Sequence, residues 1–464
     1  MDLRKYKKFY FIGIKGVGMT MLAQFLHGLG RQVSGSDIAD VFMTDQVLKK
    51  EGIRFRSSFD ASLIPTDAVI IYSAAFNAEN NEEMRFVEAN KRNFDLPILN
   101  YAQAIGALFN SYKGIAVCGS HGKTTTTAWL GYVLRHLGVD ASVLVGARVP
   151  QFKASAVRGK SEYFVAEADE YLDKLQYLLP QGIVLNNIDY DHPDFFKTHK
   201  SYYEVFARFT AKLKKNDFLV ANVADAQVRK LLLTVKGKLV TYALASKLKS
   251  KIDVTLLGHS VRREDGWQYF QVNDFGEFKI QLFGDHNIEN ALAVLASAYA
   301  LGLDPRNLKK ALAGFKGTAR RAELMGKYQG MPVYDDYGHH PTEVKATLKS
   351  FKESFPKRRL VAVFHPHTFT RTKALYKEFL TSFDEADVLG ILEIYGSARE
   401  VQGGISSRDL ISGLKAKGRK KPAKYLADFD DALSWLKKTL KPNDVLLLIG
   451  AGDIFRVGER LIKR

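Results

Sequence analysis

A glycine loop that ends in a lysine is the strongest chemical feature of the sequence. The apolar run Ile115-Ala-Val-Cys118 stops at Gly119-Ser-His-Gly-Lys-Thr-Thr125, where a helical pattern begins. The backbone amides of such a loop, the N-terminus of the next helix and the Lys123 ammonium converge where a polyphosphate can bind. Thr124 follows the lysine, so its hydroxyl can reach a magnesium ion. The loop therefore indicates a site for a nucleoside triphosphate.

This loop is two residues shorter than the usual phosphate-loop pattern, which has a glycine where this chain has Val117. A plain glycine turn with a solvent-facing lysine is the alternative interpretation. The apolar strand before the loop and about four turns of helix after it, to about Leu137, favour phosphate binding.

Acidic residues and a histidine follow the next two apolar runs of this segment. Glu167-Ala-Asp-Glu170 comes after Tyr163-Phe-Val-Ala166, and Asp189-Tyr-Asp-His192 comes after residues 182–188. Because parallel strands end at the same edge of a sheet, we expect Glu167 and His192 to share a metal site there. A histidine that is satisfied at the surface or in the core, without a metal, is the alternative.

The start of the chain is typical of a Rossmann-like nucleotide domain. Residues 8–14 predict a buried strand, a helix follows to about Leu29, and residues 32–37 predict a second strand that ends in Asp37. The glycines follow the order Gly13-x-x-Gly16-x-Gly18, which differs from the dinucleotide order and argues against a nicotinamide cofactor. The diphosphate of another nucleotide fits, with Asp37 accepting from its base or ribose. A plain strand-to-helix turn remains open.

The second half of the chain predicts an antiparallel insert and then another open sheet. Residues 253–278 are β-like, and a helix follows from Gly284 to about Leu301. Asn287 and Asn290 share one face of this helix, where they bind an adenine edge or cap the helix. Beyond Gly317-Thr-Ala-Arg-Arg321, three apolar strands, two of them at 360–364 and 445–449, each end in polar groups, which is typical of the crevice of a parallel sheet. Polar loops that only solvate the strand ends are the alternative.

Composition narrows the class of protein. A chain of 464 residues with 46% hydrophobic residues is long enough for two to four domains and fits a globular enzyme. We find no apolar stretch of membrane-spanning length and no signal-peptide core, and therefore expect a cytoplasmic protein. Its single cysteine, Cys118, ends an apolar strand and is expected to be a buried, inert thiol. The net charge of +18 comes from scattered lysines, which favours anionic small substrates over nucleic acid.

Seven ordered stretches resemble the Mur ligase family, the ATP-dependent amide-forming enzymes of peptidoglycan synthesis. They span the chain: Gly13-Ile-Lys-Gly-Val-Gly-Met19, Gly119-Ser-His-Gly-Lys-Thr-Thr125, Glu167-Ala-Asp-Glu170, Asn187-Ile-Asp-Tyr-Asp-His192, His286-Asn-Ile-Glu-Asn290, Asp335-Asp-Tyr-Gly-His-His-Pro341 and His367-Thr-Phe-Thr-Arg371. The last two stretches are most similar to the alanine-adding members. Two positions depart from the family pattern: Lys15 replaces a small residue, and Thr368 stands where many alanine-adding members have arginine.

The resemblance implies an α/β fold of three domains. These are a Rossmann-like UDP-sugar-binding domain at 1–110, a central phosphate-loop ATPase domain at 111–315 and a Rossmann-like amino-acid-binding domain at 316–464. Because the expected binding groups come from separate domains, we expect closure on binding. A monomer or weak homodimer, without a nucleic-acid or membrane partner, is the expected state.

The resemblance also implies a reaction with ATP and Mg²⁺. ATP would convert the lactyl carboxylate of UDP-N-acetylmuramate into an acyl phosphate, which the amine of L-alanine then attacks. The implied catalytic residues are Lys123, Glu167 and His192. One magnesium ion is expected on Thr124 and Glu167, and a second on Glu167 and His192.

The implied binding residues fall into three groups. ATP is expected at Gly119, Ser120, His121, Gly122, Lys123, Thr124, Thr125, Asn287, Asn290, Arg321 and Asp336. The UDP end is expected at Gly16, Val17, Gly18, Met19 and Asp37. Muramyl and alanine contacts are expected from Tyr337, His339, His340, His367 and Arg371.

Three alternatives to the alanine-adding reaction stay open. A sister ligase that recycles a ready-made tripeptide shares Glu170-Tyr171 but has a longer acidic-aromatic stretch, which this chain lacks. A nucleotide-sensing Rossmann protein would leave Glu167 and His192 idle. A nucleic-acid binder would need a clustered basic face. The sequence does not choose among alanine, serine and glycine as acceptor.

Overall fold

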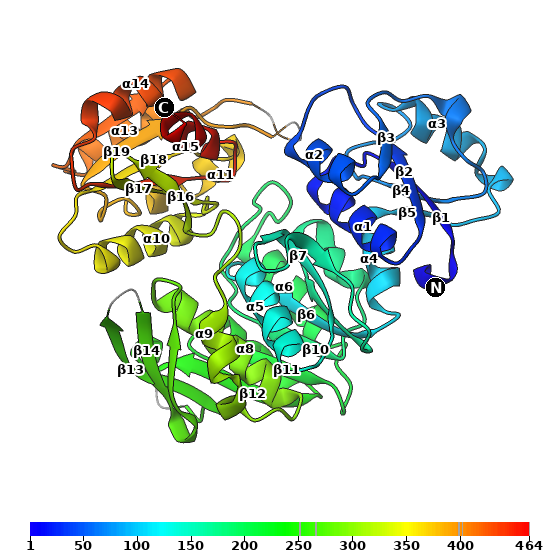
Figure 1. Cartoon of the computed structure of the whole chain (residues 1–464), viewed down its shortest axis with the longest axis horizontal. Coiled ribbons are helices and arrows are strands. Elements are labelled where there is room, and N and C mark those ends of the chain that lie inside the picture. Colours follow the sequence, from blue (N-terminus) through cyan, green and yellow to red (C-terminus); the bar gives the residue numbers. More distant parts are fainter. Residues whose placement is uncertain (250–251, 265–266, 398–399, 401, 464) are drawn as a thin grey trace.

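Three separate β-sheets organise the chain into three α/β bodies, which we call the first, central and third bodies (Figure 1). The computed structural model describes residues 1–249, 252–264, 267–397, 400 and 402–463. The predicted α/β class is confirmed.

The first body has a five-stranded parallel sheet in the order β3-β2-β1-β4-β5, which is the strand order of a Rossmann fold. Strand β1 is a continuous apolar run because helices cover both faces of the sheet. The elements are β1 (Lys8–Ile12), α1 (Val17–Gly28), β2 (Gln32–Ser36), α2 (Met43–Lys50), β3 (Arg54–Arg56), β4 (Val69–Tyr72), α3 (Glu82–Ala89), β5 (Ile98–Asn100) and α4 (Tyr101–Phe109).

The central body is built on a ten-stranded sheet in the order β15-β14-β13-β12-β11-β10-β6-β9-β7-β8. Its strands are β6 (Lys113–Cys118), β7 (Ser142–Val149), β8 (Ala154–Val157), β9 (Tyr163–Glu167), β10 (Gly182–Leu185), β11 (Phe218–Asn222), β12 (Lys238–Leu244), β13 (Leu256–Glu264), β14 (Trp267–Val272) and β15 (Gly276–Ile280). The antiparallel insert predicted for 253–278 is present as β13, β14 and β15.

Helices cover both faces of the central sheet. They are α5 (Lys123–His136), α6 (His199–Thr210), α7 (Ala226–Leu231), α8 (Asp285–Ala300) and α9 (Lys309–Gly314). Helices α5 and α8 pack into one apolar core around Trp129, which is fully buried. The other face shares its core with the first body, since Phe25 and Phe109 both pack edge-on against Phe164 of β9. An apolar interface therefore joins the first two bodies.

The third body has a six-stranded sheet in the order β16-β17-β21-β18-β19-β20, parallel except at β16. Its elements are β16 (Glu323–Tyr328), β17 (Met331–Asp336), α10 (Pro341–Ser354), β18 (Leu360–Phe364), α11 (Phe369–Ala374), α12 (Tyr376–Phe379), β19 (Val388–Leu392), α13 (Ser407–Ala416), β20 (Ala423–Leu426), α14 (Phe429–Thr439), β21 (Val445–Ile449) and α15 (Phe455–Ile462). The predicted strands at 360–364 and 445–449 coincide with β18 and β21.

The predicted domain boundaries at 110 and 315 lie between elements of neighbouring bodies and stay predictions. Helix α4 ends at Phe109 before β6 begins at Lys113, and α9 ends at Gly314 before β16 begins at Glu323. Among the described helices, none combines the length and apolar character needed to cross a membrane.

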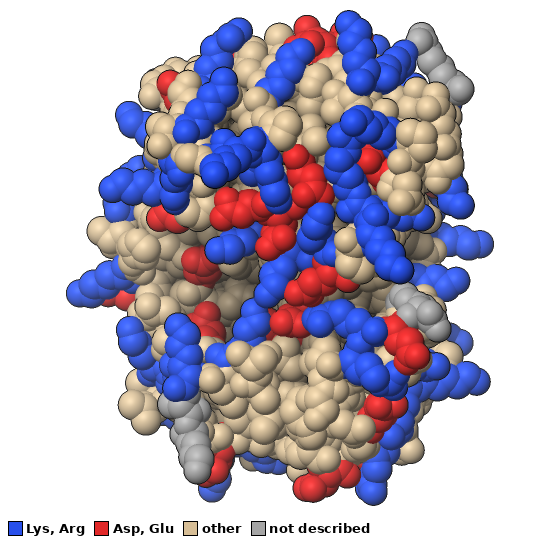
Figure 2. Space-filling model, turned by 90° about the vertical axis from the view of Figure 1, so that its left-hand side faces the viewer, with Lys and Arg blue, Asp and Glu red and all other residues tan. Residues whose placement is uncertain are grey.

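Positive and negative side chains are mixed on the face formed by the third and central bodies (Figure 2). Lysines and arginines are spread over the whole of this face, while acidic residues gather along the band between its upper and lower parts. This face carries no single basic patch among the residues drawn.

Candidate active site

The phosphate loop lies at the carboxyl end of β6, between β10 and β9 in the middle of the central sheet. The loop turns on two glycines with left-handed backbone, Gly119 at φ +122° and Gly122 at φ +79°. A Cβ at Gly119 would lie 2.8 Å from the carbonyl oxygen of Asn187, and one at Gly122 would lie 2.5 Å from Oδ1 of Asn290. Only glycine fits this close approach of backbone to its neighbours.

Lys123 begins α5, and its ammonium is held beside the loop. Its Nζ donates to the carbonyls of Gly119 at 2.6 Å and Ser120 at 3.1 Å, and it lies 3.1 Å from Oε2 of Glu170. Burial opposes the charged form, but the carboxylates of Glu170, Asp169 and Glu167 raise the pKa of Lys123. The lysine is thus a fixed cation at the helix N-terminus, where an anion binds best.

Glu170, the carboxylate that pairs with Lys123, is fully buried and is fixed by a hydrogen bond from a second residue. The Tyr202 hydroxyl on α6 donates to its Oε1 at 2.8 Å and lies 2.8 Å from the Ser120 hydroxyl. Sequence reasoning missed Tyr202, because nothing near residue 202 signals a contact with a loop 82 residues away.

Thr124 and Glu167 meet at the mouth of the loop, as the predicted magnesium site requires. The Thr124 hydroxyl donates to Oε1 of Glu167 at 2.7 Å, and the backbone amide of Gly146 donates to Oε2 at 2.7 Å. A hydroxyl and a carboxylate are hard oxygen ligands of the kind that Mg²⁺ prefers. The residues present therefore fit the ion that the sequence predicts here.

His192 lies with a different carboxylate from the one predicted. Its Nε2 is 3.9 Å from Oε1 of Glu170, and Asp169, Glu170 and His192 bring possible metal ligands within 4.8 Å of one another. Glu167 does not belong to this group. The shared site of Glu167 and His192 stays a prediction, and Glu170 is the acid that the structure adds to it.

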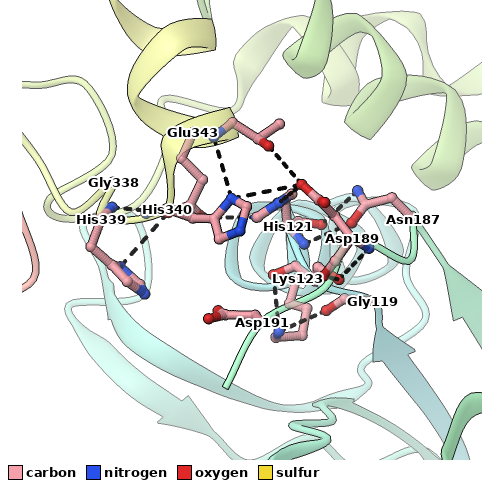
Figure 3. Close-up of polar contacts among 12 residues, drawn as sticks. Gly119, His121, Lys123, Asn187, Asp189, Asp191, Gly338, His339, His340 and Glu343 are labelled. Carbon is pink, nitrogen blue, oxygen red and sulfur yellow. Dashed lines mark hydrogen bonds and ion pairs between the residues drawn. The ribbon is translucent and has the colours of Figure 1, made fainter. Parts of the chain in front are cut away.

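His121 of the phosphate loop touches the third body (Figure 3). Its Nε2 lies 3.0 Å from Oδ2 of Asp189, and its Nδ1 lies 3.3 Å from Oε1 of Glu343 on α10. Burial lowers its tendency to hold a proton, but hydrogen bonds to both carboxylates prevail and raise the pKa of His121 to about 9. An imidazolium therefore bridges two acids that come from separate bodies, Asp189 from the central body and Glu343 from the third.

A second contact between the same two bodies is a buried ion pair. The Arg371 Nε donates to Oδ1 of Asp191 at 2.9 Å, and both residues are about 5% exposed or less. Burial disfavours the charged form of the Asp191 carboxylate, yet the charge of Arg371 holds the pKa of that group well below its ordinary value.

The two nearby histidines of the third body are neutral. Burial, followed by the charge of Arg371, lowers the pKa of His339 to about 3 and that of His367 to about 4. Their ring centroids lie 6.1 Å apart. Neutral imidazoles here can donate to a substrate and accept from it.

Arg321 and Asp336 of the third body lie near Glu343. Arg321 lies 3.8 Å from Glu343 and packs 5.4 Å from the Tyr337 ring. The Asp336 carboxylate accepts from the amides of Ala322 and Gly338, both at 2.8 Å.

The two asparagines of α8 contact the phosphate-loop helix. Asn290 accepts from the Thr126 hydroxyl at 3.2 Å and donates to Oδ1 of Asn287 at 3.1 Å. They are buried side chains, and they form a link between α8 and α5 that the sequence did not predict.

The glycine loop of the first body is a separate site. Asp37 accepts from the amide of Lys15 at 2.6 Å and from that of Ile38 at 2.8 Å. The Lys15 ammonium donates to the carbonyls of Ile38 and Asp40. Asp37 thus holds this loop in shape, and Lys15 ties it to the segment after β2. Gly16, Val17, Gly18 and Met19 form the turn and the first residues of α1.

Comparison with known proteins assigns the chain to a family. Residues 8–121 match the Mur ligase family catalytic domain, 117–298 the Mur ligase middle domain and 320–452 the Mur ligase glutamate ligase domain. A UDP-N-acetylmuramate–L-alanine ligase from Caldanaerobacter subterraneus subsp. tengcongensis is 37% identical, over 100% of this chain and 99% of that protein. The chain belongs to the Mur ligase family. The predicted resemblance is confirmed.

Two further relatives of this Mur ligase are also named for the addition of alanine, and a third is named as a murein peptide ligase. A UDP-N-acetylmuramate–L-alanine ligase from Desulfitobacterium hafniense is 36% identical over 98% of this chain and 99% of its own. The crystal structure of UDP-N-acetylmuramate-alanine ligase from Thermotoga maritima superposes with a TM-score of 0.80 at 26% identity, covering 99% of both chains. A murein peptide ligase from Psychrobacter arcticus, with a TM-score of 0.72 at 23% identity over 98% of both chains, shares the fold.

Two site residues of this Mur ligase escaped sequence reasoning for different reasons. Glu343 follows His340 by three residues at the start of α10, and this capping-box spacing predicts helix capping alone. Its second partner, His121, is 222 residues away. The sequence presents Asp191 only as a neighbour of His192. No local pattern indicates that it pairs with Arg371, which lies 180 residues further along the chain.

Proposed function

We propose that this protein is an ATP-dependent ligase that joins L-alanine to the lactyl carboxylate of UDP-N-acetylmuramate, with release of ADP and phosphate. The observation that carries the proposal is the phosphate loop. It offers a buried lysine and left-handed glycines to a triphosphate and directly faces α10 of the third body. The relatives named for this reaction span the whole chain.

The chemistry follows from the poor reactivity of a carboxylate towards an amine at neutral pH. ATP first transfers its terminal phosphoryl group to the carboxylate, which gives an acyl phosphate and ADP. The amine of L-alanine then attacks the acyl carbon, the C–O bond to phosphate breaks, and the amine loses a proton. Lys123 neutralises the charge that spreads over the transferred phosphoryl group.

Magnesium belongs to this proposal because the oxygens at the loop mouth suit it. Thr124 and Glu167 would hold one ion, and His192 with Glu167 would hold a second, where Glu170 also lies close by. The ions would supply positive charge that offsets the negative charge of the phosphate groups during transfer.

In this proposal, each of three regions of the chain binds a different part of the substrates. Residues 1–110 take the UDP end through the Gly16–Met19 turn and Asp37, and residues 111–315 take ATP through the phosphate loop, Asn287 and Asn290. Residues 316–464 add Arg321 and Asp336 to the nucleotide and face the muramyl group and L-alanine with Tyr337, His339, His340, His367 and Arg371. The reaction takes place in the cytoplasm on a monomer or weak homodimer, without nucleic acid or membrane.

Phosphate release tests the proposal directly. The protein is supplied with ATP, Mg²⁺ and UDP-N-acetylmuramate, and then with L-alanine, L-serine, glycine or the tripeptide L-Ala-γ-D-Glu-meso-diaminopimelate in turn. We expect L-alanine to give the highest kcat/KM and mass spectrometry to show the amide product. Turnover with the tripeptide alone would assign the chain to the recycling ligases, and no turnover with any acceptor would favour a nucleotide sensor.

A further inference from the structure

A cluster of two histidines and an aspartate lies between the phosphate loop and the third body. His121 comes from the loop, Asp189 follows β10, and His340 directly precedes α10. Their possible metal-binding atoms lie within 4.8 Å of one another. Figure 3 shows the three side chains side by side between the phosphate loop and α10. His340 is almost fully buried, whereas the Asp189 side chain is 40% exposed, so the cluster opens to solvent on one side.

The spacing of these atoms suits a small tetrahedral ion. Ligands about 2.0–2.1 Å from a zinc ion lie roughly 3.3 Å from one another. In this protein Oδ2 of Asp189 lies 3.0 Å from Nε2 of His121 and 3.6 Å from Nδ1 of His340. The two imidazole rings are tilted by 47° to each other, with 4.8 Å between their centroids.

Each histidine already has a partner for its other ring nitrogen. Nδ1 of His121 lies 3.3 Å from the Glu343 carboxylate, and Nε2 of His340 lies 3.2 Å from the Tyr190 carbonyl. Metal-bound histidines generally donate their second N–H to a carboxylate or carbonyl, which fixes the tautomer and the ring. The protein therefore aims Nε2 of His121 and Nδ1 of His340 at the same place.

We propose that His121, Asp189 and His340 form a site for a divalent transition-metal ion, with Zn²⁺ as the best-fitting class. Three protein ligands leave a fourth position for water. The ion takes the place of the proton that joins His121 to Asp189, and it replaces the long 3.3 Å bond from the Thr342 amide to His340. Two imidazole ligands favour Zn²⁺ over Mg²⁺.

This site is distinct from the groups proposed to bind magnesium. Thr124, Glu167 and His192 take no part in it, and a separate group of Asp169, Glu170 and His192 lies elsewhere around the loop. Because its ligands come from both the central and the third bodies, a bound ion fastens α10 to the phosphate loop. We therefore expect Zn²⁺ to slow turnover by holding the two bodies together.

Metal titration of the full-length protein without nucleotide tests the proposal. Zn²⁺ is titrated against a chromophoric chelator in the presence of millimolar Mg²⁺, and Co²⁺ is used to record the visible spectrum. We expect one Zn²⁺ with a Kd below about 10 μM and the intense Co²⁺ bands of a tetrahedral site. Asp189→Asn and His340→Ala should each weaken Zn²⁺ binding at least about tenfold.

His192→Ala is the matched control, because it removes a histidine from the other cluster. It should leave the Zn²⁺ affinity unchanged. Loss of binding in His192→Ala with retention in Asp189→Asn would overturn the proposal, as would the absence of binding in this concentration range. Since His340 caps α10, circular dichroism verifies the fold of His340→Ala, and Asp189→Asn gives the independent second test.

Discussion

The ammonium of Lys123 has three oxygen partners before a nucleotide binds: two carbonyls of its own loop and the buried Glu170. These partners fix the cation in place, so a triphosphate meets a charge that needs little reorganisation. Glu170 is in turn fixed by Tyr202. At the residue scale, the site is therefore preorganised by the two loop carbonyls, by Glu170 and, through Glu170, by Tyr202.

Replacing Lys123 by alanine should reduce kcat by about 10³-fold or more, because the charge on the transferred phosphoryl group loses its cation. Phosphate release under saturating substrates measures the effect. Lys113→Ala is the matched control: it lies at the other end of β6, and its ammonium pairs with Glu162 at the surface. Equal rates in Lys123→Ala and the unaltered protein would remove the lysine from the mechanism.

Sequence alone predicted those site residues that belong to a short motif or directly follow a strand. Lys123, Thr124 and Glu167 were found because the glycine loop and the acid at the end of the next strand are readable patterns. Glu343 and Asp191 were not assigned their partners, since those lie 222 and 180 residues away across the interface of two bodies. Such pairings depend on how the bodies dock.

At the scale of elements, the residue at which a strand ends depends on where its neighbouring strand turns away. Residues 182–188 were predicted as a strand, but β10 ends at Leu185. Leu185 pairs with Cys118, the last residue of β6, after which Gly119 turns away and the pairing of the two strands ends. Residues 8–14 likewise shorten to β1, because Gly13 has a left-handed backbone at φ +86°. A pattern of apolar residues does not contain this information.

Helix α5 has a left-handed glycine before it and another after it, which allows a matched comparison. Gly138→Ala should cost about 1 kcal/mol of stability, since its Cβ meets nothing within 4 Å and only the backbone strain remains. Gly122→Ala adds a contact of 2.5 Å with Asn290 and should also weaken ATP binding at least about tenfold. Thermal unfolding and nucleotide titration measure the two effects. Equal ATP affinity in both variants would contradict the close packing of the loop.

At the scale of the whole molecule, the two interfaces of the central body differ in character. An apolar core around Phe164 joins it to the first body, whereas charged contacts through His121 and Asp191 join it to the third. Polar interfaces between domains resemble transient ones and permit motion. We therefore expect the third body to be the part that opens and closes.

Breaking the buried pair of Arg371 and Asp191 should favour the open arrangement. Asp191→Asn removes one charge and leaves Arg371 buried without it, at a cost of about 3 kcal/mol to the closed arrangement. Small-angle X-ray scattering of the unliganded protein should show a larger radius of gyration. The matched control is Asp444→Asn: Asp444 is buried, and its ion pair with the partly exposed Arg359 lies wholly within the third body. Asp444→Asn should lower the melting temperature without changing the radius of gyration. An unchanged radius of gyration in Asp191→Asn as well would show that the pair of Arg371 and Asp191 does not hold the closed arrangement.

The buried thiol at the end of β6 has a practical consequence. Cys118 is the single cysteine of the chain, and burial raises its pKa, so it hardly forms the thiolate with which alkylating dyes react. A pair of cysteines introduced on the first and third bodies can therefore be labelled with fluorophores while the native thiol stays in place. The opening and closing that we expect of the third body would then change the energy transfer measured in single molecules.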